Sequence, residues 1–124
     1  THSFDRNEFD FSFVKGLEFE DAVATLTYFT ALVISQNIKK NFDNEIEIIL
    51  CGGGRKNLTL VNHIKKLLKY KIKLIDEFNI DGDFIESQAF AFLAIRSFLN
   101  LPISFNSTTG CTGFTVGGKL VKNF

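Results

Sequence analysis

The stretch EIEIILCGGGRKNLTL, residues 45–60, decides the fold of this chain. Residues 45–51 are rich in isoleucine and end in a nearly continuous apolar run, which predicts a strand covered on both faces, as in a parallel sheet. Three glycines follow, and Asn57 can then act as the N-cap of a helix from about 58 to 70. A strand, a glycine turn and a capped helix in this order indicate an α/β protein.

Two further helices and a second strand extend this pattern. Apolar residues recur at spacings of three and four along residues 20–41, which predicts a helix. Residues 72–75 predict a short strand, and a third helix should open at Asp81 to Asp83 and run to about Leu99. The order helix, strand, helix, strand, helix favours at least two parallel strands.

The two ends of the chain carry weaker signals. Phe9, Phe11 and Phe13 alternate with polar residues, which suits a short strand or an extended arm. A Ser/Thr/Gly loop precedes a last strand candidate at residues 114–121. Two strands are too few for a free-standing sheet with helices on both faces, so we expect the chain to be part of something larger.

Composition narrows the function classes. The chain has 124 residues, with 14 basic and 14 acidic side chains and a net charge of zero. Without excess positive charge, we expect neither a nucleic-acid partner nor a membrane surface. No apolar run is long enough to span a bilayer, and no signal peptide is visible. Two isolated cysteines then read as reduced thiols, and the expected compartment is the cytoplasm.

The glycine turn at residues 52–54 has two interpretations on its own residues. It can be a tight strand-to-helix turn that requires positive φ, or a site where a ligand approaches bare backbone. The spacing fits neither the phosphate-binding P-loop nor the dinucleotide fingerprint, because Asn57 stands where the fingerprint has its third glycine. Both interpretations stay open at this level.

A family resemblance adds to these observations. The string EIILCGGGRKNLTL is similar to the strand, triple-glycine turn and Asn-capped helix of anhydro-N-acetylmuramic acid kinases. Further segments resemble the same family in the same order. They are SFDRNEFDF (residues 3–11), EDAVATLTYFTA (20–31), DFIESQAFAFLAIRS (83–97) and LPISFNSTTGCTGFTVGGKL (101–120). Five ordered segments over nearly the whole chain make a specific signal.

The resemblance implies an actin-like (ribonuclease H-like) ATPase fold whose two lobes close over ATP and an amino sugar. It implies a kinase that uses ATP and Mg²⁺ to open the 1,6-anhydro ring of a cell-wall sugar while phosphorylating O6. In that family the glycines contact the nucleoside. Gly52, Gly53 and Gly54 would let the base and ribose lie against backbone, and Asn57 would cap the helix and contact the nucleoside as well.

Three other positions are candidate substrate contacts. Glu86 lies toward the sugar cleft in the resembled family, although Asp83 and Glu86 also have the spacing of a capping box. Ser3 and Arg6 match the family's first segment, and Arg6 could instead pair with Asp5 on the surface.

The family's phosphate-binding turn and its general base, an aspartate, have no counterpart here. Residues 1–124 are therefore interpreted as a single incomplete C-terminal kinase lobe, inactive alone, whose partner is the missing N-terminal lobe or chain. A non-catalytic remnant or interaction module that keeps the fold is the alternative, and an unrelated nucleotide-binding module is a weaker one. Apolar faces without the missing lobe would also favour a homo-oligomer.

Overall fold

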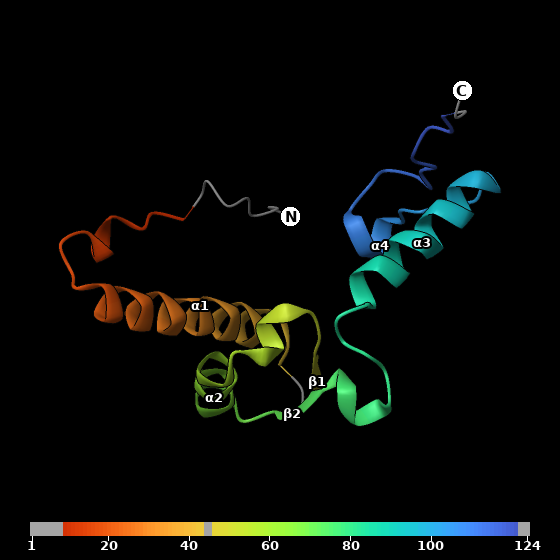
Figure 1. Ribbon diagram of the computed structural model, residues 1–124. Coiled ribbons are helices and arrows are strands. Elements are labelled where there is room, and N and C mark those ends of the chain that lie inside the picture. Colours follow the sequence, from red (N-terminus) through yellow and green to blue (C-terminus); the bar gives the residue numbers. More distant parts are fainter. Residues whose placement is uncertain (1–8, 44–45, 122–124) are drawn as a thin grey trace. The chain divides into compact units, whose positions relative to one another are not determined.

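The computed structural model describes residues 9–43 and 46–121, which divide between Asp83 and Phe84 into two compact units (Figure 1). The first unit contains α1 (Phe19–Asn41), β1 (Glu47–Leu50), α2 (Leu58–Leu67) and β2 (Lys71–Leu74). The second contains α3 (Ile85–Phe98) and the single turn α4 (Asn106–Thr109). The candidates Ser3 and Arg6, and the alternative partner Asp5, lie outside the described residues.

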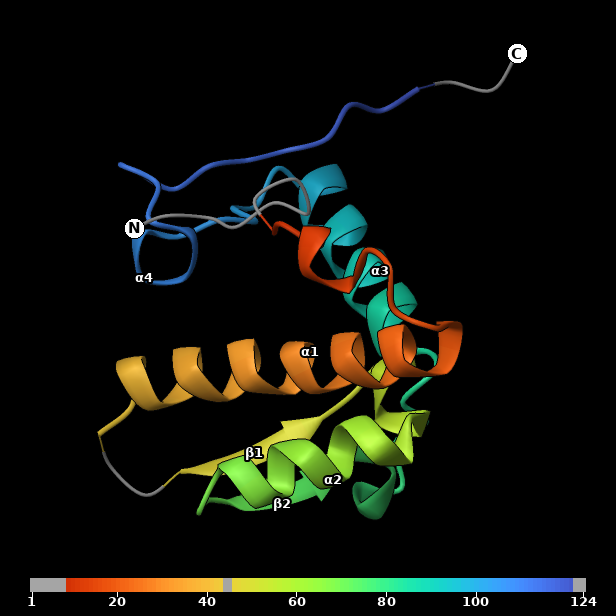
Figure 2. The same cartoon turned by 90° about the vertical axis from the view of Figure 1, so that its left-hand side faces the viewer.

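The sheet of the first unit consists of two strands. β1 and β2 pair in parallel, with Ile48 opposite Ile72 and Leu50 opposite Leu74, so the predicted parallel pair is confirmed. The two helices that flank β1 in sequence, α1 and α2, lie side by side along this sheet (Figure 2).

The core of this unit lies between the helices and one face of the sheet. Ala31 of α1 and Ile64 and Leu68 at the C-terminal end of α2 are almost fully buried. Ile48 and Ile72, which face the same side of the sheet, pack against them. The apolar stripes predicted for both helices therefore meet each other and the strands.

The other face of the sheet differs from the sequence prediction. Ile49 is 45% exposed, and Glu47 pairs with Lys71 at 3.1 Å and with Lys73 at 2.8 Å. The prediction of a strand covered on both faces is wrong for the described chain, because α1 and α2 both pack on one side. The apolar run IIL at residues 48–50 nevertheless fits a sheet whose second face is covered in a larger protein.

Residues 9–18, the described part of the chain before α1, form no strand. Residues Ser12–Val14 form a short 3₁₀ turn, and the rings of Phe11 and Phe13 pack against Phe29 of α1. The alternating phenylalanines mark an arm that folds onto a helix rather than one that pairs with a strand.

In the second unit, two predictions are corrected. The N-cap of α3 is Phe84, and the Asp83 carboxylate binds Arg55 and Lys56 instead of closing a capping box with Glu86. Of the described residues 114–121, only Thr115 makes a bridge, to Ser104, so the last predicted strand is absent there. None of the described helices combines the length and apolar character needed to cross a bilayer.

Candidate functional site

The glycine turn begins immediately after β1 and leads directly into α2. Gly52 has φ 75° and ψ −179°, a conformation that glycine adopts easily and other residues rarely. Residues Gly53–Lys56 then form one 3₁₀ turn. The interpretation that the turn needs positive φ is therefore correct for Gly52 but not for Gly53 or Gly54.

Gly53 and Gly54 are not required by the fold around them. A methyl group added at Gly53 would meet no described atom within 4 Å, and at Gly54 it would only touch the Leu60 side chain at 3.8 Å. Neither the backbone angle nor the packing of the described residues therefore explains why glycine stands at these two positions.

Asn57 closes the turn and starts the helix. Its side-chain oxygen accepts a hydrogen bond from the Leu60 N–H at 3.0 Å, so the predicted N-cap is confirmed. Such a cap stabilises a helix by about 1 kcal/mol. Asn57 also borders a shallow hollow of about 330 Å³ between the N-terminal halves of α1 and α2, lined by Val23, Thr27 and Thr59 among others.

Beneath the turn lies Arg55, whose side chain is only 5% exposed. Its guanidinium binds both oxygens of Asp76, at 2.6 and 2.9 Å, and one oxygen of Asp83 at 2.7 Å. It also donates to the Gly52 carbonyl at 3.0 Å, and Asp81 lies 3.9 Å away. Arg55 was not among the predicted site residues, because the string GGGRKN does not show whether its arginine points inward or outward.

These contacts shift the titration of the carboxylates. The Arg55 hydrogen bonds lower the pKa of Asp76 to about 2. The pKa of Asp83 is lowered mainly by a hydrogen bond from Lys56 and, to a smaller extent, by one from Arg55. The pKa of Glu47 is lowered in the same way, mainly by Lys73 and to a smaller extent by Lys71. All three carboxylates are therefore held in the charged form at neutral pH.

The low pKa of Asp76 predicts acid sensitivity. A carboxyl group whose pKa is lower in the folded than in the unfolded chain stabilises the fold above the unfolded value and loses this contribution as pH falls. We expect a constant urea midpoint from about pH 7 to 5 and a decline from about pH 4 downward. Asp76→Asn should be less stable at pH 7 and decline less steeply in acid; an equally steep decline would contradict the assignment.

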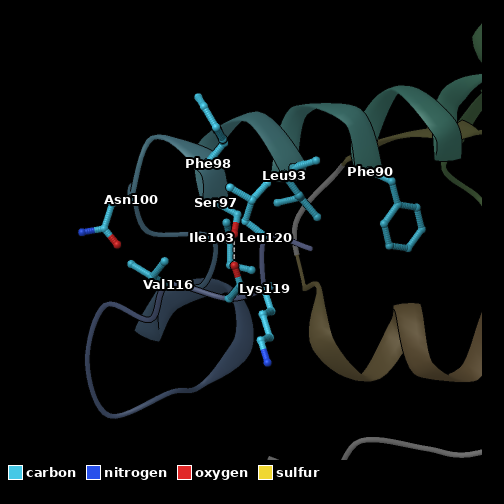
Figure 3. Close-up of a pocket in the computed structure, with 12 residues that line it drawn as sticks. Phe90, Leu93, Ser97, Phe98, Asn100, Ile103, Val116, Lys119 and Leu120 are labelled. Carbon is cyan, nitrogen blue, oxygen red and sulfur yellow. Dashed lines mark hydrogen bonds between the residues drawn. The ribbon is translucent and has the colours of Figure 1, made fainter. Parts of the chain in front are cut away.

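Glu86 belongs to the second unit, where it is exposed in the first turn of α3. It shares one helical stripe with Phe90, Leu93 and Ser97, at spacings of four, seven and eleven residues. These three residues line an apolar hollow of about 550 Å³, together with Ile103 and residues 116–120 (Figure 3). The Ser97 hydroxyl donates to the Gly117 carbonyl across it. Glu86 therefore lies on the stripe of α3 that leads into this hollow.

The described residues do not fit a Mg²⁺ site. No group of three or more His, Cys, Asp or Glu side chains in the described ranges is arranged to hold a metal ion. Asp76, Asp81 and Asp83 do converge, but their shared centre is the Arg55 guanidinium. A cation already occupies the place that a metal would need.

Comparison with known proteins finds one family that is similar to this chain over nearly its whole length. A family model described as anhydro-N-acetylmuramic acid kinase matches residues 4–123. The anhydro-N-acetylmuramic acid kinase of Pelagibacter ubique (strain HTCC1062) is 54% identical over 98% of this chain and 34% of its own length. Those of Zymomonas mobilis and Methylorubrum populi are each 38% identical, over 95% and 94% of this chain. The chain spans about a third of the length of the curated relatives it matches.

Proposed function

This chain belongs to the anhydro-N-acetylmuramic acid kinase family, and from this premise we propose that it is the nucleoside-binding, C-terminal part of such a kinase. The complete enzyme would have an actin-like fold and work in the cytoplasm. It would use ATP and Mg²⁺ to open the 1,6-anhydro ring of the amino sugar and phosphorylate O6. Residues 1–124 would form one incomplete lobe of it.

The observation that carries the proposal is the open glycine turn. Gly52, Gly53 and Gly54 present backbone without side chains ahead of α2, and a Cβ added at Gly53 would have no described atom within 4 Å. A purine nucleoside can lie flat on such a surface, where any Cβ would hold it away. Asn57 borders the adjoining hollow and can meet the ligand's polar edge while it caps α2.

On the sugar side we propose Glu86 as a substrate contact. Its carboxylate is exposed on the α3 stripe that leads into the apolar hollow, and a carboxylate suits the hydroxyl donors of a sugar. The structure makes no capping box, so this side chain is not committed to the end of its own helix. Ser3 and Arg6 remain proposed sugar contacts from the resemblance.

The phosphate chemistry is assigned to the rest of the enzyme. Phosphoryl transfer depends on positioned cations around the γ-phosphate and on an oriented nucleophile. Arg55 and Lys56 are both engaged with carboxylates, and the described residues offer no metal site. Mg²⁺, the phosphates and the general base would therefore be held by the remaining two-thirds of the family's length.

The second unit supports the need for such a partner. None of the residues of α3 is buried within the described chain, although the helix is strongly apolar. Phe90, Phe98 and Leu120 are each more than 60% exposed. An apolar surface of this kind is covered in a stable protein, here by the rest of the kinase. Without that partner, the same surface would favour self-association.

The test compares this chain alone with a chimera in which it replaces the matching third of the Pelagibacter ubique relative. Sugar-dependent ADP formation should be absent from the chain alone and present in the chimera. Turnover by the chain alone at the chimera's rate would contradict the proposed division of labour. A folded chimera that binds ATP and sugar without turnover would instead favour the non-catalytic alternative.

A further inference from the structure

A buried arginine beneath the proposed nucleotide platform calls for an explanation. Arg55 is one of the two buried polar or charged residues in the described chain, with 6% of its surface exposed. Burying a guanidinium is costly unless all its polar atoms find partners. Arg55 satisfies this condition with two carboxylates and one backbone carbonyl.

The partners of Arg55 come from three separate segments. Gly52 belongs to the turn itself, Asp76 to the 3₁₀ turn Ile75–Phe78 that follows β2, and Asp83 to the loop before α3. The planar fork of arginine can hold all three at fixed angles, which a lysine ammonium cannot. Arg55 thus ties the glycine turn to the strand end beside it.

Gly52 is the residue of the turn that these hydrogen bonds hold in place. Its carbonyl accepts from the Arg55 side chain at 3.0 Å and from the Arg55 backbone N–H at 3.3 Å. Its own N–H donates to the Gly82 carbonyl at 3.2 Å. Gly82 packs so closely that an added Cβ would lie 2.3 Å from the Arg55 Nε. Arg55 and Gly82 therefore hold the turn through Gly52, whereas a Cβ added at Gly53 would meet no described atom within 4 Å.

We propose that Arg55 is a positioning residue for nucleotide binding, which sets the Gly52–Gly54 backbone in the conformation that receives the nucleoside. This inference rests on the proposed function. A basic residue next to a kinase's glycine turn would ordinarily be assigned to phosphate binding. Arg55 is instead turned inward, and its guanidinium is already bound to Asp76 and Asp83. It acts on the ligand through backbone and does not touch it.

The test uses the chimera and separates KM from kcat. Arg55→Met should raise the KM for ATP about tenfold, since the platform loses its fixed geometry, while kcat and the KM for the sugar stay within about twofold. Arg55→Lys keeps the charge without the fork, so it should recover only part of the affinity. Lys56→Met is the matched control, because Lys56 is 61% exposed and contacts Asp83 alone, and it should leave the KM for ATP unchanged.

Two results would overturn the inference. One is a lower melting temperature for Arg55→Met with an unchanged KM for ATP, which would make Arg55 purely structural. The other is an equal rise in the KM for ATP with Lys56→Met, which would mean that both substitutions act through the loss of one positive charge. If Arg55→Met does not fold, Asp76→Asn removes one anchor and should still raise the KM for ATP about threefold; no rise would refute the inference.

The same experiment distinguishes this inference from the proposed function. Gly53→Val, which obstructs the platform directly, serves as the second arm. If Gly53→Val raises the KM for ATP and Arg55→Met does not, only the positioning role fails. If neither does, the nucleotide lies elsewhere and both proposals fail.

Discussion

Gly53→Val in the chimera should raise the KM for ATP about a hundredfold, with kcat at saturating ATP and the melting temperature close to those of the parent. Gly53 has an ordinary φ, and a side chain there meets no described atom within 4 Å, so the fold tolerates it. The isopropyl group would occupy the place proposed for the nucleoside. A hundredfold loss corresponds to about 2.7 kcal/mol of binding free energy.

Gly113→Val is the matched control for this experiment. Gly113 also has an ordinary φ, an added Cβ there would meet no described atom within 4 Å, and the residue belongs to the second unit, whereas the turn belongs to the first. This variant should bind ATP like the parent. If Gly53→Val changes the KM for ATP no more than Gly113→Val does, the turn is not the nucleoside platform. Isothermal titration with ADP checks the same point without catalysis.

The parts of the fold that could be predicted from the sequence are those fixed by neighbouring residues. The Asn57 cap depends on a residue three positions away, and the apolar stripes of α1 and α2 depend on local periodicity. The parallel pair followed from one helix between two short strands. Local chemistry decides each of these features, so the sequence was sufficient.

The features that could not be predicted depend on distant partners. Arg55 binds Asp76 and Asp83, which are 21 and 28 residues away, and nothing in GGGRKN distinguishes an inward arginine from a surface one. The capping box at Asp83 was wrong for the same reason, because two cations in the glycine turn compete for its carboxylate. The strand predicted at 114–121 lacks a described partner strand beyond the single bridge at Thr115.

Gly82 carries the largest expected effect on stability. Gly82→Ala would place a methyl group 2.3 and 2.5 Å from the Arg55 Nε and Cζ, and 2.7 Å from the Ile75 Cγ2. The guanidinium cannot move aside without giving up its hydrogen bonds, and Ile75 follows β2 directly. We expect the free energy of unfolding to fall by about 2–3 kcal/mol, measured by urea denaturation of the chain at pH 7.

Gly53→Ala is the control, since it makes the same chemical change in the glycine turn that Gly82 contacts, where the added methyl group meets no described atom within 4 Å. It should leave the free energy of unfolding within about 0.5 kcal/mol of the parent. Equal effects of the two substitutions would mean that Gly82 is not packed on Arg55.

A double-mutant cycle identifies the cause of the Gly82 effect. If the added methyl destabilises by pushing on the guanidinium, Gly82→Ala should cost less in an Arg55→Met background, since methionine bends away and has no fixed partners. The coupling free energy between the two positions should then exceed about 1 kcal/mol. Additive effects would assign the loss to Ile75 instead, and the Arg55 network would no longer be what fixes the loop beneath the glycine turn.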